Sequence, residues 1–307
     1  MSFEMSINIP PDEHGYVGRE CPECEAYFKI KPGTGLEEID TCTCPYCGHT
    51  EDAGSYFTQA QIDYATSIAV NKAMGSLIKE LKKHEFNYRP RGGFGIGMSL
   101  NVEGKPSPIQ YYREDKLETE AVCDNCTLAY SVFGVFGFCP DCGIHNSQQI
   151  FEKNLELITK VLDLVPTLEE ELQDHFISDA LENVVSAFDG FGREVCRIFA
   201  DKATDPAKAS SISFQNPAGA HKNVQTLFGL DLSLPLTASE WEFLIRCFEK
   251  RHLITHKMGI IDESYVKKAN DSFAEIGHKV TIDEQEVRQL IEYVRRISSH
   301  LSTELSK

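Results

Sequence analysis

The chain has 307 residues, of which 41% are hydrophobic and 25% charged, a composition typical of a soluble globular protein with about two to three domains. It has no apolar run long enough to span a bilayer, and residues 1–11 lack the apolar core of a signal peptide, so we expect a cytoplasmic protein. A formal net charge of −17 argues against a protein that coats nucleic acid by bulk attraction, but it is compatible with a local basic site.

Nine of the eleven cysteines fall in the first half of the chain, mostly as C-x-x-C pairs, a pattern that favours metal over disulfides in a reducing compartment. Nineteen residues separate the first two pairs, which together predict a zinc ribbon with four ligands: Cys21, Cys24, Cys44 and Cys47. Cys42 could compete with Cys44, although the Pro and Gly around the second pair favour Cys44. Cys196 and Cys247 lie on apolar helical stretches and are expected to be buried.

The two-residue spacer of each pair lets both sulfurs face one cation. A Pro after the first Cys fixes φ, and a Gly after the second allows a left-handed turn. Four thiolates close the coordination shell, whereas a catalytic zinc keeps an open position. We therefore expect structural Zn²⁺ here, rather than a catalytic or redox centre.

Residues 58–84 predict a helix, because apolar side chains recur at spacings of three and four from Ile62 to Leu81, before Pro90 and Gly92-Gly93 break the pattern. The segment after it mixes aromatics with Arg89 and Arg91, which would suit RNA binding or a cationic interdomain linker equally well.

Two short strands are expected next, at residues 99–102 and 109–113. They lead into a second zinc ribbon, whose pairs are twelve residues apart: Cys123, Cys126, Cys139 and Cys142. Phe133, Phe136 and Phe138 are expected to pack against its metal site. The predicted domains of this half are zinc ribbon 1 (1–57), a connecting helix (58–90), and short strands with zinc ribbon 2 (91–147).

Residues 148–307 predict an antiparallel helical bundle, with apolar stripes from Leu155, from Ile177 and from Val287 onward. Residues 202–238 are expected to form a loop with a short helix at 223–228, and Thr237 or Ser239 should cap the next helix. The expected fold class is mainly α: a helical bundle preceded by two small β zinc ribbons and a connecting helix.

The helix that starts before Trp241 carries the residues most suited to chemistry. Leu244 and Phe248 define its apolar line; Arg251 falls about 60° to one side of Phe248, and two histidines fall on the other side. Charged groups rarely border a core-facing stripe unless they are paired or functional. Arg suits bidentate phosphate contacts, and an imidazole titrates near working pH, at about 6.5.

Residues 251–256, Arg-His-Leu-Ile-Thr-His, resemble the R-x4-6-H motif of HEPN-domain ribonucleases, in which the residue after the Arg is commonly Asn, Asp or His. The following residues 257–262 are also similar to that family, as is the preceding segment 227–231. The resemblance covers roughly residues 148–307 and implies a HEPN-like helical domain.

The resemblance further implies a homodimer in which two copies of the motif form one composite site that cuts RNA without a catalytic metal. His256 would transfer the proton, Arg251 would stabilise the transition-state charge, and His252 would orient or polarise the pair. The products would be 2′,3′-cyclic phosphate and 5′-hydroxyl ends. Such proteins act as toxins or anti-phage effectors, so an antitoxin or trigger protein is an expected partner. Arg246, Lys250 and Lys257 add positive charge that could contact RNA.

Three other interpretations stay open. Arg251 could pair with a carboxylate of the bundle while His256 caps its helix, which would leave a non-catalytic zinc-ribbon and HEPN adaptor for nucleic acid or protein. The ribbons could instead contact DNA or a polymerase in a regulator. His252 and His256 could also bind a metal, although Leu253 stands where H-E-x-x-H has its glutamate.

Overall fold

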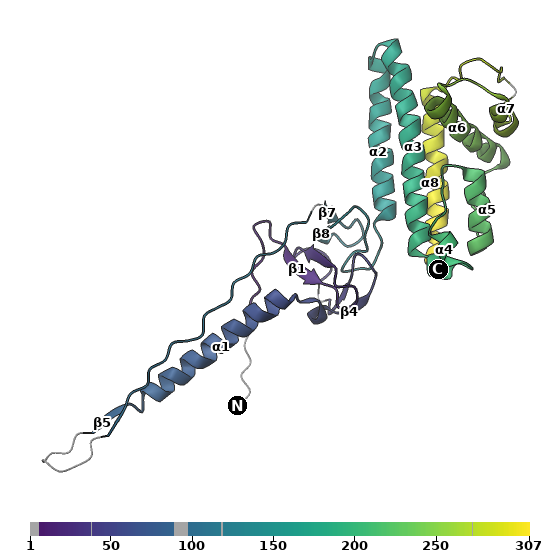
Figure 1. Cartoon of the computed structure of the whole chain (residues 1–307). Coiled ribbons are helices and arrows are strands. Elements are labelled where there is room, and N and C mark those ends of the chain that lie inside the picture. Colours follow the sequence, from purple (N-terminus) through teal and green to yellow (C-terminus); the bar gives the residue numbers. More distant parts are fainter. Residues whose placement is uncertain (1–5, 38, 89–97, 118, 272) are drawn as a thin grey trace. The chain divides into compact units, whose positions relative to one another are not determined.

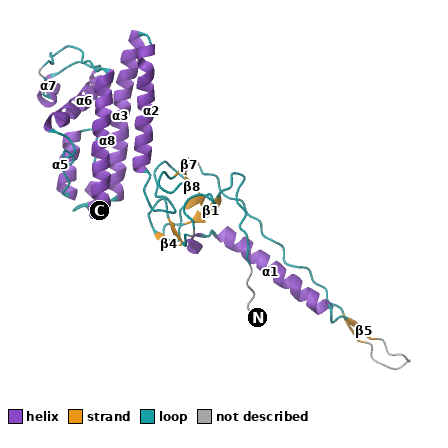
Figure 2. Cartoon of the chain, turned by 180° about the vertical axis from the view of Figure 1, so that it is seen from behind, coloured by secondary structure: helices purple, strands orange, loops and turns teal. Residues whose placement is uncertain are grey.

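A computed structural model describes residues 6–307 except 38, 89–97, 118 and 272. The chain forms two compact units, residues 1–145 and 146–307 (Figure 1). The fold is mainly α, with small antiparallel strands confined to the first unit, as Figure 2 shows. Over the described part of the chain, no helix has the length and apolar character needed to cross a membrane.

The first unit is built on a four-stranded antiparallel sheet with strand order β1-β2-β8-β7. Its strands come from both cysteine-rich regions: β1 (Val17–Glu20), β2 (Tyr27–Ile30), β7 (Thr119–Val122) and β8 (Ala129–Val132). The pairing of Lys29 with Ser131 and of Ile30 with Tyr130 joins β2 to β8. The two predicted ribbons therefore share one sheet, although about a hundred residues separate their strands.

A second hairpin, β3 (Thr41–Thr43) with β4 (Thr50–Asp52), leads into the 3-10 helix η1 (Ala53–Tyr56). The core of this unit is formed by the cysteines together with Phe28, Tyr56, Leu128 and Tyr130. Phe133, expected in that core, is instead half exposed, because it stands just beyond the end of β8. Phe136 and Phe138 are half-buried and contact the His145 ring.

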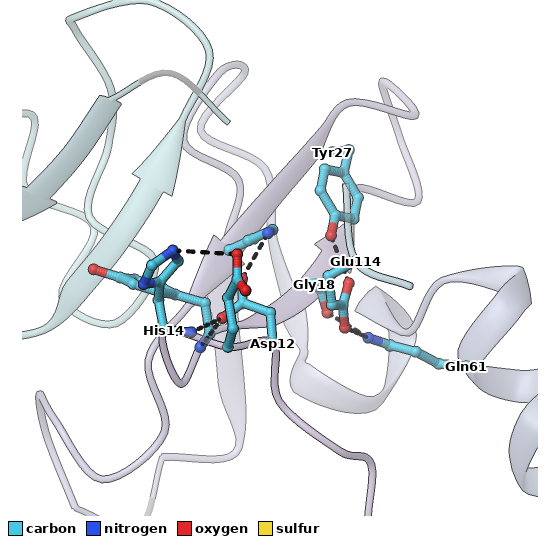
Figure 3. A network of polar contacts seen from close by, with 9 residues as sticks. Asp12, His14, Gly18, Tyr27, Gln61 and Glu114 are labelled. Atoms are coloured by element: carbon cyan, nitrogen blue, oxygen red, sulfur yellow. Dashed lines mark hydrogen bonds and ion pairs between the residues drawn. The ribbon is translucent and has the colours of Figure 1, made fainter. Parts of the chain in front are cut away.

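The predicted connecting helix is confirmed as α1 (Gln59–Lys82). Its N-terminus is held by a capping box, in which Thr58 accepts from the Gln61 N–H and the Gln61 side chain accepts from the Thr58 N–H. The buried Gln61 amide also donates to the Gly18 carbonyl and to Glu114, which in turn accepts a 2.5 Å hydrogen bond from the Tyr27 hydroxyl (Figure 3). This network ties the base of α1 to β1 and β2.

Residues 101–113 run back along α1 toward the sheet, and together with α1 they form what we call the arm (Figures 1 and 2). Asn71 Nδ2 donates to the Ser107 carbonyl, and the Gln110 N–H donates to Ser67 Oγ at 3.0 Å. The strand expected at 109–113 is therefore wrong, because this segment bonds to helix side chains instead of to another strand. Part of the strand expected at 99–102 is confirmed as β6 (Met98–Leu100), which pairs with β5 (Phe86–Tyr88).

The second unit is a helical bundle whose four long helices are α2 (Ser147–Leu164), α3 (Glu170–Ile198), α6 (Ala238–Lys257) and α8 (Glu284–Ser306). Shorter helices join them: η2 (Val165–Thr167), η3 (Ala200–Lys202), α4 (Pro206–Ala209), α5 (Pro217–Phe228) and α7 (Glu263–Ala269). The apolar side chains meet in one core, which includes a tilted ring pair, Phe151 with Phe191, and an edge-to-face pair, Phe188 with Phe248.

The bundle is antiparallel only in part. The ion pairs Arg295–Glu152 and Arg288–Asp163 show that α8 runs opposite to α2. However, Lys202, just after α3, donates to the Leu305 carbonyl near the end of α8, so α3 and α8 run in the same direction. The long connection through α4 to α7 allows this arrangement.

The expectation of a loop at 202–238 with a short helix at 223–228 is wrong in extent, because α5 spans twelve residues rather than six. Asn216 caps it by accepting from the Gly219 N–H, and Pro217 occupies its first turn, so a start signal was present in the sequence. Gly229 ends it in the left-handed region at φ 70°. Thr237, one of the two predicted caps, is confirmed as the N-cap of α6.

Glu240, in the first turn of α6, should make the bundle sensitive to acid. Hydrogen bonds from Arg296 and from the Thr237 N–H hold the pKa of Glu240 at about 2, below its usual 4.5. Stabilisation by this carboxylate is therefore complete above about pH 4.5 and lost as the pH falls toward 2.

We expect Glu240→Gln to lower the urea midpoint of unfolding at pH 7, with the difference from wild type shrinking below pH 4.5. Urea titrations followed by fluorescence of Trp241, the only tryptophan, measure this directly. A pH-independent difference would contradict it.

Candidate functional site

All four C-x-x-C segments adopt one backbone geometry. In each, the N–H of the first cysteine donates to the carbonyl five residues later, and the N–H four residues later donates back to that cysteine's carbonyl. The residue after the second cysteine has positive φ: Glu25, Gly48, Thr127 and Gly143. Glycine was the sequence signal for this turn, and two of the four positions reach it without glycine.

The sulfurs of each predicted site come together as two clusters of four cysteines, at Cys21/24/44/47 and at Cys123/126/139/142. Sulfur–sulfur distances are 3.7 Å for Cys21–Cys47 and 3.4 Å for Cys126–Cys139. A tetrahedral cation with metal–sulfur bonds of about 2.3 Å places its ligands about 3.8 Å apart. The donor set and its spacing therefore fit a metal ion in each cluster.

Cys44, and not Cys42, belongs to the first cluster. Cys42 is buried on β3, where burial raises the pKa of its thiol to about 12. Its neighbour in space is the Arg19 guanidinium, which acts against that shift. Cys196 and Cys247 are buried in the bundle core, as expected.

Burial also raises the pKa of the cluster thiol of Cys126, to about 11. Because a metal binds the thiolate, loading this cluster must release protons into solution. A bound metal ion would therefore supply the electrostatic compensation that an apolar, cysteine-rich core would otherwise lack.

Arg251 occupies a core position of α6, and not the border of its apolar stripe. It continues the buried series Leu244, Cys247 and Phe248 at helical spacing and is itself only 7% exposed. Its Nε is enclosed and has no hydrogen-bond partner among the described residues. The sequence already contained this placement, since 244, 247, 248 and 251 follow the i, i+3, i+4, i+7 rule.

His252 and His256 lie next to each other on the exposed face of α6, with ring centroids 5.0 Å apart. Burial, then the neighbouring His256, hold the pKa of His252 below its ordinary 6.5, against the opposing influence of Glu249. His252 is thus held toward its neutral form at neutral pH. The helix ends just beyond, with Met258 and Gly259 both in the left-handed region.

The other predicted RNA contacts on α6 are engaged within the chain. Lys250 is buried in a 2.6 Å ion pair with Glu286 of α8. Arg246 donates to the carbonyls of Ala269 and Asn270, and Lys257 pairs with Asp262. Arg89 and Arg91 lie outside the described residues.

The structure bears on two alternative interpretations: that Arg251 only forms an ion pair within the bundle, and that His252 and His256 bind a metal. Arg251 has no carboxylate partner among the residues that the structure describes, so the interpretation as a simple bundle ion pair loses its support. His252 and His256 have no third metal-ligating neighbour in the described chain, where the two cysteine clusters are the metal-ligand groups found. Arg251 is therefore a buried guanidinium with no carboxylate partner in the described chain, and two accessible imidazoles lie on the exposed face of the same helix. A guanidinium suits the binding of an anion, and an imidazole suits proton transfer.

The chain matches no protein-family model, no curated protein and no solved structure, so any assignment of function is drawn from the residues themselves.

Proposed function

We propose that the protein is a metal-independent endoribonuclease whose reaction depends on Arg251, His252 and His256. The observation that supports this most directly is the enclosed Nε of Arg251, which has no partner among the described residues, on the same helix as two exposed imidazoles. A buried guanidinium without a protein carboxylate is costly unless an anion approaches it. RNA phosphate is such an anion, and the resemblance to HEPN ribonucleases in residues 251–256 agrees with it.

In the proposed reaction, His256 accepts the proton of the RNA 2′-hydroxyl as that oxygen attacks the adjacent phosphorus. The bond between phosphorus and the 5′-oxygen breaks, and the leaving oxygen gains a proton. The products carry a 2′,3′-cyclic phosphate and a 5′-hydroxyl. Arg251 stabilises the negative charge that develops on the phosphoryl oxygens, and His252, kept neutral, orients or polarises the pair.

A second copy of the chain completes the site in this proposal. Arg251 and His256 are five residues apart, so they project about 140° apart around α6 and do not converge within one copy. A homodimer can bring Arg251 of one copy to His256 of the other. An effector of this kind, a toxin or anti-phage protein, would need a trigger or a neutralising partner. Both cysteine clusters would hold structural Zn²⁺ that takes no part in the reaction.

The test is cleavage of total RNA by the full chain in a short incubation with EDTA. We expect cleavage by wild type and a loss of at least about a hundred-fold in Arg251→Ala and in His256→Ala. His278→Ala removes another exposed imidazole of the same unit and should leave the rate unchanged. Product ends are identified by whether 5′ labelling proceeds without phosphatase treatment.

Mixing the two inactive variants tests the composite site. The composite site of a dimer holds two Arg251–His256 pairs, and a mixed dimer keeps one of them intact. Half of the dimers are mixed after random exchange, so about a quarter of the wild-type rate should return. Recovery of no activity would contradict a shared site. Intact RNA with wild type under every trigger tried would favour the adaptor alternative, which the internal pairing of Lys250 and Lys257 also favours.

A further inference from the structure

Part of the arm is basic in a protein that is otherwise strongly acidic. Residues 72–113, from the middle of α1 to the end of the returning segment, hold eight of the chain's 30 lysines and arginines but only three of its 47 aspartates and glutamates. The remainder of the chain is therefore even more acidic than the net charge of −17 indicates. Positive charge confined to one segment of an acidic protein is typical of a local binding site for a polyanion.

The charges of α1 are separated by sign around the helix. At 100° per residue, its lysines and the lysine that follows as C-cap fall within about 100° of arc. We call these four residues the lysine face: Lys72, Lys79, Lys82 and Lys83. The two carboxylates of α1, Asp63 and Glu80, lie outside this arc. All four lysines are exposed, and only Lys83 has an ion-pair partner among the described residues, Glu80.

The helix dipole accounts for only part of the lysine face. Lysines in the last turn of a helix are stabilised by its negative end, and Lys79 and Lys82 stand there. Lys72 lies ten residues before the end of α1, beyond the range of that effect. The lysine face therefore presents unpaired positive charge along about 15 Å of helix, from Lys72 to Lys82.

The surroundings of the lysine face favour a nucleic acid over a protein or a membrane. A protein interface has an apolar centre, but the large apolar side chains exposed on α1, from Ile62 to Leu81, are centred on the opposite side of the helix. A helix that inserts its apolar side into a membrane surface would point these lysines away from the lipid head groups. A phosphate backbone, in contrast, is bound by lysine and arginine side chains without an apolar centre.

We propose that the lysine face binds the phosphate backbone of single-stranded RNA. A single strand can follow a row of lysines, whereas an RNA duplex has a major groove too deep and narrow for side chains to read. Tyr111 of the returning segment is 80% exposed, with its ring centroid 6.0 Å from that of Tyr64, so a base can stack on it. The choice of RNA over DNA rests on the proposed function, in which the arm holds the substrate.

The experiment measures the fluorescence anisotropy of a labelled oligouridylate of about 20 nucleotides. The full chain is used in a His256→Ala background, so that the probe is not cut. Lys72→Gln/Lys79→Gln/Lys82→Gln, the lysine variant, should weaken binding at least about ten-fold at about 50 mM salt. Because three phosphate contacts are lost, the slope of log affinity against log salt should also become shallower by about 2.

The matched control, Lys160→Gln/Lys208→Gln/Lys222→Gln, removes the same charge from exposed lysines of the helical bundle and should change neither quantity. An equal loss of affinity in the control would overturn the proposal, since binding would then follow bulk charge. Polyglutamate or anionic vesicles that bind the lysine face more tightly than RNA would overturn it in favour of an acidic protein or a membrane. A preference of at least about ten-fold for oligodeoxythymidylate or for an RNA duplex would overturn the assignment to single-stranded RNA.

Failure of this proposal can be distinguished from failure of the proposed function, because binding is measured without cleavage. If the lysine variant keeps the full affinity while wild type still cuts RNA, the lysine face is excluded and the nuclease proposal stands. If wild type leaves RNA intact yet binds it through the lysine face, the nuclease proposal fails and the binding site stands.

Discussion

Replacing Cys139 with serine is expected to unfold the first unit while the helical bundle stays folded. Cys139 is fully buried and lies 3.4 Å from Cys126 within the second cluster. Removing one of four thiolates opens the coordination shell, and structural zinc contributes on the order of 10 kcal/mol or more to folding. The short strands around it, three or four residues each, cannot replace that contribution by hydrophobic burial.

The two units can be followed separately in the intact chain. Trp241 is the only tryptophan and lies on α6 in contact with the His221 ring, so its fluorescence reports on the bundle. Zinc content and protease resistance of residues 1–145 report on the first unit. Prolonged chelation of wild type should have the same effect as Cys139→Ser.

Cys42→Ser is the matched control, because Cys42 is a buried cysteine of the same unit that lies outside both clusters. We expect it to keep both zinc ions and to lose only about 1 kcal/mol. If Cys139→Ser retained two zinc ions and the wild-type melting profile, the assignment of these clusters as structural metal sites would be wrong.

The second large effect is expected at Gly192 on α3. A Cβ built there would lie 2.5 Å from ring atoms of Phe214, which is fully buried. The ring cannot retreat freely, because the Phe214 N–H donates to the buried Asp189 carboxylate at 2.6 Å. Gly192→Ala should therefore reduce the free energy of unfolding of the bundle by about 2–3 kcal/mol.

Gly190 supplies the control two residues earlier on the same helix. A Cβ there meets no atom within 4 Å, so Gly190→Ala should raise stability by up to about 1 kcal/mol through helix propensity. Urea denaturation followed at Trp241 measures both variants. Similar effects of the two substitutions would mean that α3 and Phe214 are less closely packed than the structure indicates.

Sequence reasoning reached the two clusters of four cysteines because the signals for them are local. The C-x-x-C spacing, the proline and the glycine are all read within a few residues of each metal site. The pairing of β2 with β8 could not be reached in the same way, since it joins segments a hundred residues apart and no turn signal encodes it. Residues 109–113 were likewise predicted as a strand because their hydrogen-bond partner, Ser67 on α1, is distant in sequence.

The candidate site on α6 shows a different limit. Helical periodicity placed Arg251 and the two histidines on one helix. The spacing of Arg251 from Leu244 also indicates that Arg251 belongs to the buried face of that helix. It could not show which cations have partners, because the partners lie on other helices: Glu286 of α8 takes Lys250, and no described carboxylate takes Arg251. Such long-range pairing depends on tertiary packing rather than on sequence spacing.

The hydrogen bond between Gln61 and Glu114 has a consequence for how this protein can vary in length. It brings the two ends of the arm together at the sheet, fifty-three residues apart in sequence. The entropic cost of closing a loop rises only with the logarithm of its length. A change in the length of the arm beyond this hydrogen bond therefore changes the free energy of folding of the sheet only slightly. The arm can therefore vary in length by whole helical turns with little effect on the stability of the sheet and the cysteine clusters.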